Sequence, residues 1–374
     1  MAGIYIHIPF CRQACYYCDF HFSTNTSRQE EMVDSLCREI ALQRYYLQGE
    51  PIQTIYIGGG TPSLLTQQQL ILLMEQIHSI FPVAQDAECT LEANPDDLSM
   101  EKLDALQRTG INRLSLGIQS FNDQLLQQMN RLHNARQAVD AFHRARQAGF
   151  VNISIDLIYA IPGETTSQWQ KDIEQALTLK PEHISSYSLT IEEKTVFGRW
   201  AQIGKLHPEP DDTAAHHLEM LVDYLTTAGY EQYEVSNFAW PGFYSRHNSS
   251  YWKQQSYLGI GPGAHSYNKE SRQFNIRNNH RYIDALQQNV IPAEKEVLTV
   301  PDKINEYLLT TLRTQWGTNL QKLEEEYGYA IQTKHGGYIQ ALIDRNLARL
   351  EANHLLLTRK GRMLADKIAS DLFQ

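Results

Sequence analysis

The stretch Tyr5–Phe20, YIHIPFCRQACYYCDF, carries three cysteines at C-x3-C-x2-C spacing. The alternating run before them predicts a short strand that Pro9 ends, so Cys11, Cys15 and Cys18 fall on the loop directly after a strand. Three thiolates on one loop suit a metal or an iron–sulfur cluster. Small buried residues or half of a zinc site are the alternatives. Buried cysteines have no reason to cluster, however, and a structural zinc site needs a fourth ligand nearby.

The composition bounds the class of protein. The 374 residues allow two domains, or one large domain with an appendage. Lys and Arg number 33 against 43 Asp and Glu, and a net charge of −10 argues against nucleic acid as the main partner. An odd count of five cysteines fits a reducing compartment better than a disulfide framework. We expect Cys37 and Cys89 to lie in the core.

The sequence shows no signal-peptide pattern and no run near the roughly 20 apolar residues of a membrane span. We therefore expect a soluble, cytoplasmic protein.

A strand followed by a helix recurs six times. The expected strands are residues 5–8, 52–57, 89–93, 113–118, 153–158 and 183–190. Capping boxes are expected at Ser27 with Glu30 and at Thr66 with Gln69, and a further helix begins near Asn134. Such repeats imply a parallel sheet with right-handed crossovers. Because candidate chemistry follows nearly every strand, we expect an α/β fold with an incomplete (β/α)6 barrel rather than a doubly wound sheet.

Polar residues and glycines gather at the carboxyl ends of these strands, where barrels bind ligands. A glycine-rich run, Gly58-Gly59-Gly60-Thr61-Pro62, would let the backbone approach a ligand closely. The alternative is a tight turn between strand and helix. The run lacks the Lys of a triphosphate-binding loop, so triphosphate binding is not expected. Glu92 and Asp156 interrupt apolar strands, where a carboxylate is costly unless it binds something such as ribose hydroxyls. Gln119 offers an amide, and Arg131 could hold a carboxylate. A local hydrogen bond or ion pair is the alternative for each.

The last third of the chain follows another pattern. A strand is expected at 230–236, and then an irregular segment from 238 to about 279, functional or mobile as long loops usually are. Helices at 304–312, 320–327 and 338–347, a hairpin at 350–357 with its turn at Ala352-Asn353, and a last helix capped by Thr358 resemble a winged-helix module. We expect domains 1–200 (partial barrel), 201–299 (barrel extension) and 300–374 (mostly helical, winged-helix-like).

The run Arg246–Trp252, RHNSSYW, lies in that irregular segment. A His beside Tyr251 and Trp252 could be an axial ligand to a haem that stacks on the aromatic rings. Spacing alone favours the alternative, a surface His.

The cysteine motif, the GGGTP run and the strand-end residues together resemble the radical S-adenosylmethionine superfamily, and within it the oxygen-independent coproporphyrinogen oxidase-like group. The resemblance implies that Cys11, Cys15 and Cys18 hold three irons of a [4Fe–4S] cluster, whose open iron takes the methionyl group of S-adenosylmethionine. It places around S-adenosylmethionine the residues Tyr5, Tyr17, Gly59, Gly60, Thr61, Glu92, Gln119, Arg131 and Asp156.

Two details select a subgroup. The oxidases continue C-x3-C-x2-C-x-C and carry an N-terminal extension, whereas here Phe20 stands two residues after Cys18 and the sequence starts almost on the strand. This chain resembles the HemW family of haem chaperones at two places. That family has Phe at the position of Phe20, and it carries the motif H-N-x-x-Y-W, which stands here at 247–252. The resemblance implies that His247 binds haem.

The expected function is a cytoplasmic haem chaperone that hands haem to proteins such as respiratory enzymes. Peripheral membrane association and a homodimer are left open. The rival functions are the oxidative decarboxylation of coproporphyrinogen III and a degenerate scaffold that uses neither cluster nor S-adenosylmethionine.

Overall fold

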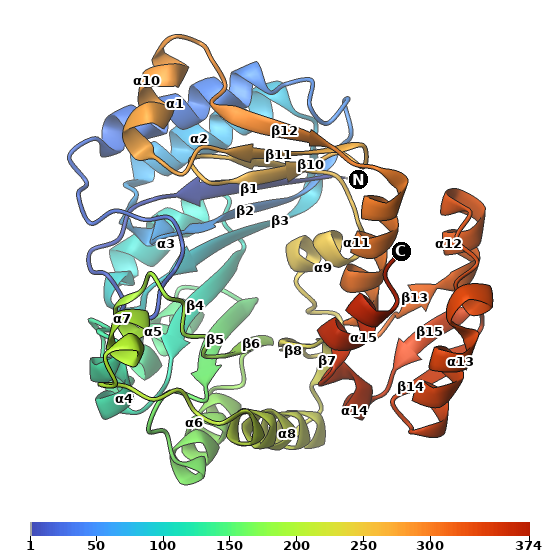
Figure 1. Cartoon of the computed structure of the whole chain (residues 1–374). Coiled ribbons are helices and arrows are strands. Elements are labelled where there is room, and N and C mark those ends of the chain that lie inside the picture. The colour runs from blue at the N-terminus through green and yellow to red at the C-terminus, as the bar shows by residue number, and fades with distance from the viewer. Residues whose placement is uncertain (1) are drawn as a thin grey trace.

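The computed structural model describes residues 2–374, and a twelve-stranded sheet is their centre (Figure 1). The strand order is β12-β11-β10-β9-β1-β2-β3-β4-β5-β6-β8-β7. Six consecutive strands of this sheet pair in parallel and in chain order, which confirms the partial barrel. They are β1 (Ala2–Ile8), β2 (Ile52–Gly59), β3 (Val83–Ala93), β4 (Arg113–Gln119), β5 (Ile153–Tyr159) and β6 (His183–Ser188).

The sheet extends beyond the barrel strands on both sides. β9 (Tyr257–Ile260) pairs in parallel with β1, and the antiparallel β10 (His265–Tyr267), β11 (Ser271–Asn275) and β12 (Ala293–Val297) follow it outward. At the other side β8 (Asn237–Ala239) pairs with β6, and β7 (Glu231–Glu234) pairs with β8. The expectation of an irregular segment at 238–279 was therefore wrong, because short strands that pair with strands distant in sequence fill much of it.

Helices cover the outside of the sheet (Figure 1). The helices that follow the barrel strands are α1 (Gln29–Leu42), α2 (Gln67–Ile80), α3 (Met100–Arg108), α4 (Asp123–Gln128), α5 (Ala135–Gln147) and α6 (Thr166–Leu179), and two 3-10 turns lie at Pro62–Leu64 and Pro95–Asp97. Those beyond β6 are α7 (Val196–Gln202), α8 (Asp211–Thr227), α9 (Arg246–Trp252) and α10 (Asn279–Gln287).

The capping predictions had mixed outcomes. Thr66 with Gln69 and Asn134 with Gln137 form capping boxes. The box at Ser27 was wrong, since α1 begins two residues later and the Ser27 amide donates to Asn25 Oδ1 at 3.0 Å within the preceding turn.

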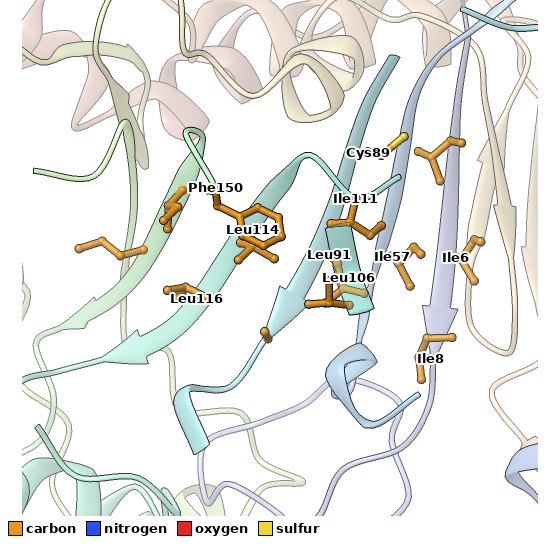
Figure 2. Packing of buried hydrophobic residues seen from close by; sticks show 14 of the residues in the cluster. Ile6, Ile8, Ile57, Cys89, Leu91, Leu106, Ile111, Leu114, Leu116 and Phe150 are labelled. Carbon is orange, nitrogen blue, oxygen red and sulfur yellow. The ribbon is translucent and has the colours of Figure 1, made fainter. Parts of the chain in front are cut away.

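The core fills the space between the sheet and its helices. Figure 2 shows strand residues such as Ile57, Leu91 and Leu114 beside Leu106 of α3. Cys89 lies in this core and Cys37 packs against it, as expected.

The C-terminal unit has its own core, built from residues between Ile304 and Leu372. Its sheet has the order β13 (Thr318–Asn319), β15 (His354–Leu357) and β14 (Ala348–Glu351). Its helices are α11 (Val300–Leu312), α12 (Leu320–Tyr327), α13 (Ile331–Asp344), α14 (Arg359–Arg362) and α15 (Ala365–Asp371). Ala352 and Asn353 have φ of 44° and 65° and form the hairpin turn, and Thr358 caps α14. This is the expected winged-helix-like arrangement, whereas the exact domain boundaries stay predictions.

No helix within residues 2–374 combines the length and the apolar character needed to cross a membrane.

Candidate functional site

The carboxyl ends of the barrel strands surround a cavity of about 540 Å³, here called the cysteine cavity. Its wall contains every sequence-predicted site residue except Tyr5 and His247. Those present are Cys11, Cys15, Cys18, Tyr17, Gly59, Gly60, Thr61, Glu92, Gln119, Arg131 and Asp156.

Tyr16 anchors the loop that carries the cysteines. Its amide donates to the Met129 carbonyl at 3.1 Å, and its own carbonyl accepts from the Phe197 amide at 2.9 Å. Its ring meets that of Trp200 edge-on at 5.1 Å between centroids. The loop is therefore held by α7 and by the end of α4, both of which are distant from it in sequence.

The three thiols are half-buried and free of disulfides. Burial raises the pKa of Cys11 to about 11 and that of Cys18 to about 12, so both are thiols near neutral pH until iron displaces the proton. Among residues 2–374, no three or more His, Cys, Asp or Glu side chains are arranged around one metal ion. A tetrahedral zinc site needs ligands that converge on one point, whereas the irons of a cluster take one thiolate each. Three thiols on one loop are donors of the kind that hold an iron–sulfur cluster.

Gly59 and Gly60 bring the end of β2 against the cysteine loop. Gly59 has a φ of 109°, which favours glycine. A Cβ on Gly60 would lie 2.6 Å from the Phe10 carbonyl oxygen and 3.0 Å from Cys11 Sγ. Only glycine fits at this close approach, so the run does more than make a turn.

Glu92 is held from two sides. The Tyr56 hydroxyl donates to Oε1 at 2.8 Å and the Gly59 amide donates to Oε2 at 3.0 Å. Burial first, and then the nearby Asp156, raise the pKa of Glu92 to about 7. Lone pairs that remain on this carboxyl group can accept hydrogen bonds from ligand hydroxyls.

Asp156 faces the same cavity from β5. The Ser115 hydroxyl donates to its two carboxyl oxygens at 3.1 and 3.3 Å. Burial raises the pKa of Asp156 to about 6, so the group is mostly ionised near neutral pH.

Arg131 brings a cation to the cysteine side of the cavity. Its Nη2 donates to Asn94 Oδ1 at 2.6 Å and to the Gly117 carbonyl at 2.7 Å, and Nη1 lies 3.4 Å from Cys15 Sγ. Its Nε is buried and has no partner among the described residues. A buried donor without a partner is costly, and a ligand carboxylate would satisfy it.

Gln119 adopts a left-handed backbone with φ of 69°, at a break in register between β4 and β5. A side chain longer than Gly in this conformation is strained, and such strain gathers at ligand sites.

Sequence reasoning missed several residues of this wall. Arg113, which begins β4, is 1% exposed, lines the cavity and leaves its Nε without a partner. Tyr56 supports Glu92, and Asn248 enters from α9. The charge of Arg113 inside a strand pattern was a signal that could have identified it.

A second cavity, of about 570 Å³, lies between the β1–β9–β10–β11 side of the sheet and α11, and is here called the histidine cavity. Three histidines, four tyrosines and two arginines line it together with Phe20 and Trp252. These are His7, His21, His265, Tyr5, Tyr251, Tyr257, Tyr267, Arg272 and Arg277. Tyr5, expected beside the cysteine cavity, faces this one. Phe20 lines both cavities.

His247 lines neither cavity. It lies on α9, 1% exposed, and its Nδ1 hydrogen-bonds with Thr54 Oγ1 at 2.8 Å and its Nε2 with the Tyr251 hydroxyl at 2.7 Å. Its ring stacks on that of Tyr56 at 5.1 Å between centroids. It is thus neither in a loop nor at the surface. Helix α9 lies between the sheet and α11 (Figure 1), with Asn248 at one cavity and Tyr251 at the other.

Two family models match the chain. Residues 5–176 match the radical SAM superfamily, and residues 298–364 match the HemN C-terminal domain.

Several similar proteins carry the same name, and two of them match nearly the whole chain. "Heme chaperone HemW" of Bacillus subtilis is 37% identical over 98% of this chain and 98% of its own length. That of Lactococcus lactis is 39% identical over 97% and 95%, and that of Escherichia coli is 39% identical over 70% and 69%. Among solved structures, the Escherichia coli radical SAM enzyme coproporphyrinogen III oxidase covers all of this chain with 90% of its own length, at a TM-score of 0.86 and 23% identity. That likeness shows the fold.

Proposed function

This chain belongs to the HemW family of haem chaperones within the radical SAM superfamily, and from that premise we propose that it binds haem and transfers it to haem-requiring proteins. One observation carries the proposal: relatives named haem chaperone are 37% and 39% identical to this chain over nearly its whole length. The oxidase matches it only in fold, at 23% identity.

We further propose that the cysteine cavity holds a [4Fe–4S] cluster on Cys11, Cys15 and Cys18. The free thiols, the close approach of Gly60 and the absence of a single-ion arrangement among residues 2–374 support this assignment. Such a cluster, when bound, supplies an electron to the sulfonium of S-adenosylmethionine.

The same cavity offers what S-adenosylmethionine needs. Glu92 and Asp156 present carboxylates to ribose hydroxyls, and Arg131 has a free donor for the methionyl carboxylate. Gln119, Thr61 and Tyr17 add polar groups to the same wall. The chain's own part is to bind and orient S-adenosylmethionine and to exclude water around it.

Haem titration tests the chaperone function. We expect the purified, reconstituted chain to bind haem in an absorbance titration and to pass it to an apo-acceptor, such as the haem-free form of a respiratory enzyme. Failure of both steps would overturn the proposal. We propose that the protein works in the cytoplasm and that its acceptors are haem-requiring respiratory enzymes. Light scattering on the same preparation measures its oligomeric state.

The rival function has its own test. The chain is incubated anaerobically with coproporphyrinogen III, S-adenosylmethionine and a reductant, beside an authentic oxidase as positive control. We expect no protoporphyrinogen from this chain, and its formation would favour the oxidase. Reconstitution with iron and sulfide that yields no cluster would instead indicate a degenerate scaffold.

A further inference from the structure

The cysteine cavity extends from the carboxyl ends of the strands down the inside of the barrel. On β4, every second residue from Arg113 to Gln119 lines the cavity, whereas Leu114 and Leu116 belong to the core (Figure 2). A strand rises about 3.3 Å per residue, so the backbone of Arg113 lies about 13 Å below that of Gly117, whose carbonyl accepts from Arg131. The floor of the cavity, around Arg113, is thus separate from the end at which Arg131 and the cysteines lie.

The guanidinium of Arg113 has no partner in the protein. Its Nε is buried without a hydrogen bond, and none of its N–H groups bonds to or forms an ion pair with any residue in 2–374. Arg131, the other arginine of this wall, donates to Asn94 and to Gly117. A guanidinium carries five N–H donors and a full charge, and burying them unmet is costly.

Two histidines within electrostatic range of Arg113 are already committed. Burial, and then the charge of Arg113, lower the pKa of both His183 and His247. The ring nitrogens of His183 hydrogen-bond with the hydroxyl groups of Ser154 and Tyr233, each at 2.7 Å. Both nitrogens of His247 are likewise taken. Neither imidazole therefore has a nitrogen left to accept from Arg113.

Asp156 is not the counter-ion of Arg113. Its carboxyl oxygens accept from Ser115, and no ion pair joins it to another part of the chain that the structure describes. Burial raises the pKa of Asp156 to about 6, whereas a guanidinium at pairing distance would hold that pKa below its usual value of 3.8. The charge of Arg113 thus remains without an acidic partner.

A single buried water would not meet the need either. Thr90 lies opposite Arg113 in the register of β3 and β4, and its hydroxyl oxygen is also buried without a partner. One water between them would satisfy Thr90 Oγ1 and Arg113 Nε. It would leave the other N–H donors and the charge unmet, whereas an anion at the floor of the cavity satisfies both.

The surroundings select the kind of anion. A planar carboxylate matches the guanidinium fork with two parallel hydrogen bonds. Asp156, and Glu92 with its pKa of about 7, lie on the same wall and repel a dianion such as phosphate more strongly than a monoanion. Ile158 and Leu189 give the wall an apolar part for the body of an organic molecule.

We propose that the floor of the cysteine cavity binds a small organic molecule with one carboxylate, which Arg113 holds beneath the place proposed for S-adenosylmethionine. The site is separate from haem binding and goes beyond the proposed function. It gives the cavity a second ligand, whose apolar body lies against Ile158 and Leu189.

The test uses the full, reconstituted chain and butyrate, a monocarboxylate with a short apolar body. Urea midpoints measured by tryptophan fluorescence at increasing butyrate give its dissociation constant, because a ligand of the folded state raises stability. Butyrate should raise the midpoint of wild type. Butyramide, which matches butyrate in size without its charge, and inorganic phosphate should not raise it at equal ionic strength.

Variants of Arg113 separate a binding role from a structural one. Arg113→Met should bind butyrate about tenfold more weakly or worse. Without butyrate its urea midpoint should equal or exceed that of wild type, because an apolar side chain replaces an uncompensated buried charge. Arg113→Lys keeps the charge without the fork and should bind with intermediate affinity.

Two controls complete the design. Arg136→Met changes a side chain that is 91% exposed on α5, and it should respond to butyrate as wild type does. S-adenosylmethionine should bind Arg113→Met as tightly as it binds wild type, since Arg113 lies below its site.

The outcomes are distinguishable. If wild type responds to butyrate no more than to butyramide, or if Arg113→Met keeps the response, Arg113 holds no carboxylate. If Arg113→Met unfolds at lower urea without butyrate, or does not fold, Arg113 has a structural role and the proposal fails. A response to phosphate alone overturns the class of ligand, and weaker binding of S-adenosylmethionine to Arg113→Met overturns the separate site. The assay contains no haem, so each of these results leaves the chaperone function untouched.

Discussion

Replacing Gly60 with alanine tests whether the close approach of two strand ends builds the cysteine site. The added Cβ would lie 2.6 Å from the Phe10 carbonyl oxygen, 2.9 Å from the Ile8 carbonyl oxygen and 3.0 Å from Cys11 Sγ. Two of these contacts are backbone atoms, which cannot rotate away. The Gly60 amide also donates to the Ile8 carbonyl at 2.8 Å, and any shift that relieves the clash lengthens this bond.

The expected cost follows from these contacts. Overpacking of this kind costs about 1–3 kcal/mol. A weakened backbone hydrogen bond adds about 0.5–1.5 kcal/mol. We therefore expect Gly60→Ala to lower the free energy of unfolding by roughly 2–4 kcal/mol. The softest neighbour is the cysteine loop, so we expect displacement of Cys11 and less iron per chain.

The assay measures urea unfolding by tryptophan fluorescence, and iron and sulfide per chain after anaerobic reconstitution. Gly337→Ala on α13 is the control, because a Cβ there meets nothing within 4 Å. It should load wild-type iron and gain up to about 1 kcal/mol from helix propensity. If Gly60→Ala unfolds at the wild-type urea concentration and loads wild-type iron, the steric reasoning is refuted.

Three other substitutions test the cavities and the core. Glu92→Gln places an amide group where the Gly59 amide and the Tyr56 hydroxyl both donate hydrogen bonds. We expect this variant to bind S-adenosylmethionine roughly ten- to hundredfold more weakly in isothermal titration, a loss of about 1.5–3 kcal/mol in binding free energy. Its iron content should be unchanged. Thr54→Val leaves His247 Nδ1 buried without a partner and should lower the free energy of unfolding by about 1–3 kcal/mol; an unchanged urea midpoint would contradict that reading. Burial raises the pKa of Glu39 from 4.5 to about 7, so the folded chain binds more protons than the unfolded chain in this range, and stability is lost as pH rises from 4.5 to 7. Glu39→Gln should flatten that slope in urea titrations by of the order of 3 kcal/mol over the interval, and an equal slope in both proteins would exclude Glu39 as its source.

The barrel could be predicted because its signals are local. Each parallel strand is an apolar run flanked by turn residues, and the cysteines and Gly58–Gly60 follow such runs directly. Polar groups at the carboxyl ends of parallel strands share one face by topology, so Glu92 and Asp156 could be grouped without coordinates.

Residues 238–279 could not be predicted in the same way. β8, β9 and β10 have three or four residues each, too few to show a period of two, and their partners are far away in sequence. Helix α9 is only seven residues long, too short to show a clear helical period in the sequence. Its N-cap could have been recognised, because Ser245 accepts a hydrogen bond from the Asn248 amide. The wall on which Tyr5 lies depends on this pairing, whereas the family resemblance, and not the strand pattern, places Tyr5 beside S-adenosylmethionine.

The position of β1 has a consequence for how the chain folds. This strand, which carries the cysteine loop, pairs with β2 on one side and with β9, some 250 residues later, on the other. During synthesis β1 therefore remains an unpaired edge until residues 257–260 leave the ribosome. Contacts this distant in sequence slow folding. The scaffold is complete only late in translation, so premature termination before residue 257 would leave the strand beside the cysteines exposed to pairing with other chains.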